Sequence, residues 1–188
     1  MSFPKPLMMA QQIVRSAVRE GGVAVDATLG NGHDALFLAK LVGKEGKVYG
    51  FDVQEEAITT SNLKVQEAGV ECELSFHCRG HEHLAETVQE PVQAVMFNLG
   101  YLPRADKAVI TTVETTLPAL GQACDLLEKG GVISVMCYPG HEGGDVEAQE
   151  VLKWASSLPR EGWRVIQYGF INAPNNPPFL VAIEKLSA

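Results

Sequence analysis

A glycine-rich turn between two acidic residues has the composition of a nucleotide-type cradle: Asp26-Ala-Thr-Leu-Gly-Asn-Gly-His-Asp34. Gly30 and Gly32 permit a tight turn with positive φ and let backbone N–H groups approach a ligand without a Cβ in the way. Asp52 lies 22 positions after Gly30, where an acidic residue accepts hydrogen bonds from ribose hydroxyls. Gln54, just beyond it, is expected to line the adenine side. Together these residues predict a cofactor site.

Charge decides between two classes of cofactor for this turn. Gly30, Gly32 and Ala35 also satisfy the G-x-G-x-x-G/A pattern of dinucleotide-binding enzymes. A pyrophosphate requires an unobstructed helix N-terminus, whereas Asp26 and Asp34 would repel a diphosphate and favour the ammonium and sulfonium groups of S-adenosylmethionine. The turn therefore predicts S-adenosylmethionine as the cofactor. The alternatives are a dinucleotide, or a purely structural turn in which Asp34 helps to cap the helix.

A second turn, Phe97-Asn-Leu-Gly-Tyr-Leu-Pro103, ends an apolar segment with Gly and Pro. It resembles the Asn-Pro-Pro-Tyr turn of amino methyltransferases. An Asn side-chain oxygen and the next backbone carbonyl hold the hydrogens of an amine so that its lone pair aligns with a methyl group, and an aromatic ring stacks on a planar base. Asn98 and Tyr101 are therefore candidate catalytic residues for methyl transfer to nitrogen.

An aliphatic amine with a pKa of about 10.4 must lose a proton before it attacks. The candidate proton acceptors are Asp106, His141 and Glu142, and His141 follows an apolar segment in Tyr138-Pro-Gly-His-Glu-Gly-Gly144. The same segment is equally typical of a glycine-rich helix N-terminus, in which Glu142 and Asp145 favour the helix dipole. Both interpretations remain open at this point.

A third polar segment, Gly80-His-Glu-His83, follows a predicted strand at the position where methyltransferases contact adenine. His81 or Glu82 is expected to contact the cofactor there. Alternating histidines also occur at metal sites, but neither a partnering cysteine nor a third ligand lies nearby in the sequence. We therefore expect no metal.

Hydrophobic periodicity places these turns between alternating strands and helices. The predicted helices are 7–19, 33–41, 55–68, 107–127 and 145–156, and the predicted strands are 22–27, 47–52, 71–77, 92–97, 132–138, 163–171 and 179–185. Lys129-Gly-Gly is expected to stop the fourth helix with a left-handed cap. The βαβ order predicts parallel pairing, whereas the last two strands, joined without a helix, should be antiparallel.

The predicted architecture is a single doubly wound, Rossmann-like α/β domain over residues 1–188 of the class I methyltransferase type, mostly parallel with a C-terminal antiparallel hairpin. In such a sheet a ligand lies outside the carboxyl ends of the strands, at the switch point where the first strand neighbours the fourth. The turns after Asp26 and Phe97 should therefore meet at one site.

Composition and sequence patterns bear on the cellular compartment of this chain, which is 46% hydrophobic and 20% charged. Its apolar runs are far shorter than the roughly 20 residues of a membrane-spanning helix, and its start lacks the pattern of a secretory signal. The four cysteines form no C-x-x-C pair. We therefore expect a cytoplasmic protein without membrane contact. The net charge of −8 argues against coating nucleic acid by bulk electrostatics but is compatible with a local basic site.

Several segments in this order resemble the “putative rRNA methylase” family. They are Asp26 to Asp34, Phe51-Asp-Val-Gln54, Asn98-Leu-Gly-Tyr-Leu-Pro103, Tyr138 to Gly144 and Asn175-Asn-Pro-Pro178, which together span nearly the whole chain. The resemblance to its MnmM-like members implies methylation of the exocyclic amine of 5-aminomethyl-2-thiouridine at the wobble position of tRNA. It also implies the tRNA anticodon arm as partner.

The resemblance further implies roles for individual residues. The cofactor would be lined by Gly30, Asn31, Gly32, Asp52, Gln54, His81 and Asn98, and the target nucleotide would face Tyr101, Lys107 and His141. Arg104 and Ala105 stand where the family pattern usually has Gly-Gly, and Arg104 joins the candidate substrate contacts.

Other functions fit part of the same pattern: methylation of rRNA or of a small amine or phenol metabolite, dinucleotide-dependent oxidoreduction, and non-enzymatic nucleotide sensing. The acidic balance requires that an anticodon arm be bound by a local patch. A homodimer would join two such patches.

Overall fold

Helices and strands alternate along the chain in a computed structural model that describes residues 2–100, 110–140 and 143–187. The elements are α1 (Pro6–Ala17), β1 (Val23–Asp26), α2 (His33–Val42), β2 (Lys47–Asp52), α3 (Glu55–Glu67), β3 (Glu73–Cys78), the 3-10 helix η1 (His81–His83), α4 (Leu84–Thr87), β4 (Val92–Asn98), α5 (Val113–Leu126), β5 (Leu127–Cys137), α6 (Gly144–Ser156), β6 (Trp163–Tyr168) and β7 (Phe179–Lys185).

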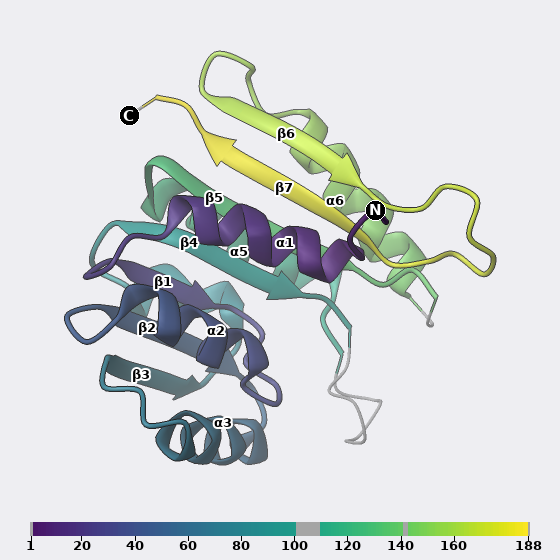
Figure 1. The fold of residues 1–188 in the computed structure, drawn as a ribbon. Helices are drawn as coiled ribbons and strands as arrows, with labels where there is room; N and C mark the ends of the chain where they lie inside the picture. Colours follow the sequence, from purple (N-terminus) through teal and green to yellow (C-terminus); the bar gives the residue numbers. More distant parts are fainter. Residues whose placement is uncertain (1, 101–109, 141–142, 188) are drawn as a thin grey trace.

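The strands form one twisted seven-stranded sheet in the order β3-β2-β1-β4-β5-β7-β6 (Figure 1). β1 to β5 pair in parallel, and β7 is antiparallel to both β5 and β6. β1 lies beside β4, with Asp26 opposite Met96, which confirms the predicted switch point. The class I α/β architecture with its C-terminal hairpin is likewise as predicted.

Helices cover both faces of the sheet (Figure 1), and the parallel strands other than the edge strand β3 are mostly buried. On one face, α1, α2 and α3 pack Val14, Leu38 and Val65 against β1, β2 and β4. On the other face, Leu84, Leu120 and the α6 residues Ala148 and Val151 form the larger core. This accounts for the continuous apolar runs of the central strands, because a strand covered on both faces cannot alternate with polar residues.

The fourth long helix starts later than predicted. α5 begins at Val113, six residues after the predicted start at Lys107, and residues 107–109 lie outside the described part of the chain. Thr112 is extended and forms a capping box with Thr115. The hydroxyl-to-backbone contacts of such a box satisfy the orphan N–H groups of a first turn, so the helix begins there although the periodic pattern extends further back.

The predicted glycine cap of this helix is wrong. α5 ends at Leu126, and the chain enters β5 directly through Leu127, whose backbone is extended. Gly130, with φ +80°, lies within β5, where the register against β4 shifts between Val92 and Ala94. The glycines therefore accommodate extra residues in a bulged strand, a role that sequence periodicity does not distinguish from a helix stop.

Smaller differences concern element ends. β3 is shifted by one to two residues from the predicted 71–77, β6 ends at Tyr168 instead of residue 171, and the turn after β3 contains the unpredicted η1 and α4. Within the described residues, no helix has the length and apolar character needed to cross a bilayer.

Candidate functional site

A cavity of about 790 Å³ opens at the carboxyl ends of the parallel strands. Its walls come from the segments after β1, β2, β3, β4 and β5, from α1, and from the loop between β6 and β7. The lining residues include Gln11, Asp26, Thr28, Asn31, Asp34, Asp52, Gln54, His81, Glu82, Asn98, Thr111, Tyr138, Asn175 and Asn176. The two turns that the sequence singled out therefore face the same space.

The glycine-rich turn is tightly constrained. Gly30 and Gly32 have φ of +48° and +69°, as the motif predicts, and a Cβ at Gly32 would lie only 2.6 Å from Ser61 Oγ. The Asp52 carboxylate accepts hydrogen bonds from the backbone N–H groups of Gly30 and Gln54, both at 2.9 Å. Asp52 thus ties the end of β2 to the turn after β1 and fixes the shape of the cavity floor.

Asp26 is a buried carboxylate at the base of this turn. Its Oδ1 accepts the Thr28 N–H at 3.2 Å, while its Oδ2 is buried and finds no hydrogen-bond partner among the described residues. Burial raises the pKa of Asp26 well above its usual range, and the neighbouring Asp34 carboxylate raises it further. A positive group in the cavity would relieve both effects, because it favours the ionised form.

Asp34 holds the side chain of Asn98 in a defined orientation. Asn98 Nδ2 donates a short hydrogen bond to Asp34 Oδ2, and Gln11 Nε2 on α1 donates to Asp34 Oδ1 at 3.5 Å. A carboxylate only accepts, so the amide nitrogen of Asn98 turns toward Asp34 and its Oδ1 is left as an acceptor. Burial raises the pKa of Asp34, and the bonds from Asn98 and Gln11 oppose that rise.

The backbone after β4 is anchored by consecutive N–H groups. The Asn98 N–H donates to Thr28 Oγ1 at 2.7 Å, the Leu99 N–H to Met136 O at 3.0 Å, and the Gly100 N–H to Thr111 Oγ1 at 2.8 Å. The first bond joins the two predicted turns across 70 residues of sequence. The position of Asn98 is therefore set by three separate parts of the fold.

His81 also lines the cavity, and its burial favours the neutral imidazole. Its Nδ1 is 3.1 Å from Ala27 O, and since a carbonyl only accepts, Nδ1 carries the hydrogen and Nε2 is an acceptor. Burial lowers the pKa of this imidazole. Nε2 is buried without a partner among the described residues, so a residue that lines the cavity carries one unsatisfied acceptor.

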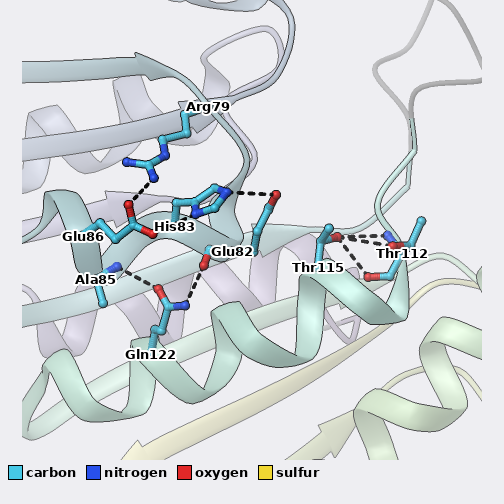
Figure 2. A network of polar contacts seen from close by, with 8 residues as sticks. All are labelled: Arg79, Glu82, His83, Ala85, Glu86, Thr112, Thr115 and Gln122. Atoms are coloured by element: carbon cyan, nitrogen blue, oxygen red, sulfur yellow. Dashed lines mark hydrogen bonds and ion pairs between the residues drawn. The ribbon is translucent and has the colours of Figure 1, made fainter.

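The turn that carries His81 is braced by α5. Figure 2 shows Gln122 donating to Glu82 O at 2.6 Å and accepting the Ala85 N–H at 2.8 Å. The His83 Nδ1 lies 2.9 Å from Glu86, which also pairs with Arg79. The two histidines therefore have different partners, and among the described residues no group of His, Cys, Asp and Glu side chains is arranged to hold a metal.

The cavity wall is acidic. Asp26, Asp34, Asp52 and Glu82 line it, and the described lining contains neither Lys nor Arg. A diphosphate would meet repulsion here, whereas a cation would be stabilised. The geometry therefore favours a positively charged ligand with a nucleoside part over a dinucleotide.

The predicted cofactor residues come together in this structure. Asp26, Asn31, Asp34, Asp52, Gln54, His81, Glu82 and Asn98 all line the cavity, and Gly30 and Gly32 shape its turn. The predicted residues Tyr101, Arg104, Lys107 and His141, and the weighed alternatives Asp106 and Glu142, lie outside the described residues. Their roles stay predictions.

Several lining residues had no individual role assigned from the sequence. Gln11 comes from α1, Thr111 precedes α5, and Tyr138 follows β5. Burial and the Asp34 carboxylate raise the pKa of Tyr138, so its hydroxyl stays protonated. Asn175 and Asn176, with φ of +60° and +46°, were recognised only as part of a motif. Both residues have a left-handed backbone, which is uncommon outside glycine. The sequence motif did not indicate this conformation.

Comparison with known proteins gives a family and a close relative. The family model described as “Putative rRNA methylase” matches residues 48–184. The chloroplastic tRNA (mnm(5)s(2)U34)-methyltransferase of Arabidopsis thaliana is 38% identical over 192 residues, covering 96% of this chain and 70% of that protein.

Solved structures match over the full length. A Clostridium thermocellum protein described as “putative rRNA-methylase” has a TM-score of 0.96 and 39% identity, covering 99% of this chain and 100% of its own. A “putative methyltransferase” of Streptococcus mutans, solved in complex with SAH, has a TM-score of 0.90 and 37% identity, covering 98% and 100%. SAH is the demethylated form of S-adenosylmethionine.

Proposed function

The chain belongs to the rRNA methylase family and is an S-adenosylmethionine-dependent methyltransferase, and on that premise we propose that it methylates the exocyclic amine of 5-aminomethyl-2-thiouridine at the wobble position of tRNA. The acidic cavity and the oriented Asn98 are the structural support. The substrate is suggested by the 38% identical plant protein, whose name specifies a modified uridine at position 34 of tRNA.

The cavity residues fit the cofactor. We assign the ribose to Asp52, the adenine to the wall of Gln54, His81 and Glu82, and the cationic methionine part to the side of Asn31, Asp26 and Asp34. The buried acceptors Asp26 Oδ2 and His81 Nε2 support this assignment, since buried polar atoms normally have a partner. The bound cofactor supplies a methyl group on a positively charged sulfur, which makes that methyl electrophilic.

The orientation of the Asn98 side chain is the observation that supports an amine as the methyl acceptor. Its Nδ2 faces Asp34, so its Oδ1 is available to accept a hydrogen bond from the neutral amine of the substrate. Held so, the nitrogen lone pair points at the methyl carbon. A new N–C bond forms as the S–C bond breaks and its electron pair stays on sulfur, and the product ammonium then loses a proton.

The RNA contacts are assigned by position in the chain. Tyr101, Arg104 and Lys107 lie between Gly100 and Thr111, both of which line the cavity, and His141 follows Gly140, which does so too. We propose that Tyr101 stacks on the uracil and that Arg104 and Lys107 contact phosphates of the anticodon arm. His141 is proposed to accept the proton that the ammonium form of the substrate loses before its nitrogen attacks.

Purified protein and defined RNA substrates test this function. Labelled S-adenosylmethionine would be incubated with tRNA carrying 5-aminomethyl-2-thiouridine, with the unmodified tRNA transcript, with rRNA, and with the free modified nucleoside. We expect methylation of the modified tRNA alone, identified by nucleoside mass spectrometry. Methylation of rRNA would reassign the substrate, and equal turnover of the free nucleoside would make the enzyme a small-amine methyltransferase.

A further inference from the structure

A buried carboxylate on α6 is bonded to the segment that follows Asn98. Glu147 is only 3% exposed. Its Oε2 accepts the Thr111 hydroxyl at 2.8 Å and its Oε1 accepts the Thr116 hydroxyl at 2.7 Å. Glu147 itself does not line the cavity, whereas Thr111 does. Thr111 therefore connects Glu147 to the cavity by a direct hydrogen bond.

The direction of these hydrogen bonds is fixed by the chemistry of a hydroxyl. Thr111 Oγ1 has a single hydrogen, which goes to the Glu147 carboxylate because a carboxylate only accepts. Its lone pairs remain to accept the Gly100 N–H at 2.8 Å. The Thr111 N–H in turn donates to Gly100 O at 3.0 Å. Gly100 and Thr111 are thus paired on both sides, and Glu147 orients the hydroxyl between them.

We infer that Glu147 and Thr111 are positioning residues for the methyl acceptor, acting through Gly100, which they clamp two positions after Asn98. The clamp, defined as Gly100, Thr111 and Glu147, brings together the two ends of the segment 101–109. Gly100 has φ +123°, a conformation that other residues rarely adopt, so this backbone needs an external partner to keep one geometry. The inference rests on the proposed function for the role of Asn98 and for the identity of the RNA.

Thr111→Val tests the clamp, with Thr116→Val as the matched control. Both replace a buried or half-buried hydroxyl bonded to the same carboxylate, and both leave one Glu147 oxygen without its donor. Only Thr111→Val also removes the acceptor of the Gly100 N–H. At saturating S-adenosylmethionine we expect Thr111→Val to lower kcat/KM for the modified tRNA about tenfold, the equivalent of one hydrogen bond, with SAH affinity unchanged. Thr116→Val should retain kcat/KM, and Thr111→Ser should restore it.

Amide hydrogen exchange gives a readout that needs no substrate. The Gly100 amide should be protected in the wild-type protein and in Thr116→Val, and should exchange freely in Thr111→Val. Fast exchange of Gly100 in the wild-type protein, or equal losses of kcat/KM in both valine variants, would overturn the inference. An inactive wild-type enzyme with a protected Gly100 amide would instead count against the proposed substrate while the clamp stands.

Discussion

The turn after β1 and the turn after β4 face one cavity but are held in different ways. The first is built locally, because its glycines, its two carboxylates and the nearby Asp52 lie within 27 residues of sequence, from Asp26 to Asp52. The second depends on distant segments: Thr28, Met136 and Thr111 each accept one of its N–H groups. The cofactor half is thus a motif, whereas the acceptor half is assembled by the tertiary fold.

Because of this difference, we expect the first turn to determine cofactor binding and the second turn to determine the rate of methyl transfer. A local turn with buried carboxylates is suited to hold a cationic cofactor whatever the substrate. The acceptor turn must place one amide oxygen against a nucleophile, and a small misplacement there costs rate more than affinity. Substitutions in the two turns should therefore affect different kinetic quantities.

The largest effect is expected from Asn98→Ala. Loss of the oriented amide should lower kcat by about 100-fold, while SAH affinity measured by calorimetry should change by less than about threefold. Asn62→Ala, on the exposed face of α3, is the matched control and should keep full activity. An equal loss of SAH affinity in Asn98→Ala would place this side chain in the cofactor half and break the comparison.

Asp26→Asn should affect cofactor affinity more than kcat. The neutral side chain removes the attraction for the cationic cofactor, so the Kd for S-adenosylmethionine should rise about tenfold. The raised pKa of Asp26 means that this group favours folding below the usual carboxyl range, and that this contribution is lost as pH rises through the raised value. At pH 8 the cofactor-free variant should therefore be more stable than the wild type.

Thermal and denaturant unfolding at that pH check the second part of this prediction. A variant that is less stable than the wild type at alkaline pH would show that Asp26 is ionised at little cost in the folded protein. That outcome would contradict the raised pKa of Asp26, and the Kd of the Asp26→Asn variant alone would then test its attraction for the cationic part of the cofactor.

A smaller effect is expected in proton uptake and release. Bound S-adenosylmethionine should lower the raised pKa values of Asp26 and Asp34 toward the usual range. Binding should then release up to about one proton, and affinity should increase with pH between the usual and the raised values. Calorimetry in two buffers of different ionisation enthalpy measures this release. SAH, which lacks the sulfonium charge, should release less, and identical values for both ligands would contradict the assignment.

Much of the cofactor half could be predicted from the sequence. Gly30, Gly32 and Asp52 belong to a pattern in which spacing and residue type reflect local geometry, and the structure places Asp26, Asp34 and His81 around the same cavity. The parallel pairing and the neighbouring first and fourth strands followed from the βαβ rhythm in the same way, whereas the position of β7 between β5 and β6 was not predicted.

The acceptor half could be predicted only in part. Asn98 was visible because it ends an apolar strand, but its partners Gln11 and Thr111 come from segments whose relation to it is fixed only by packing. Glu147 was missed because an acidic residue near a helix N-terminus normally favours the dipole at the surface, and nothing in its sequence neighbourhood indicates burial. The helix start at Val113 was misplaced because apolar periodicity does not reveal the capping box of Thr112.

Nucleoside mass spectrometry of tRNA from cells lacking this protein is the most direct test of the central claim. The account predicts that 5-methylaminomethyl-2-thiouridine disappears from the wobble position and that 5-aminomethyl-2-thiouridine accumulates, with recovery by the wild-type gene and none by the Asn98→Ala variant. An unchanged wobble uridine, with both forms at their normal levels, would contradict the proposed substrate.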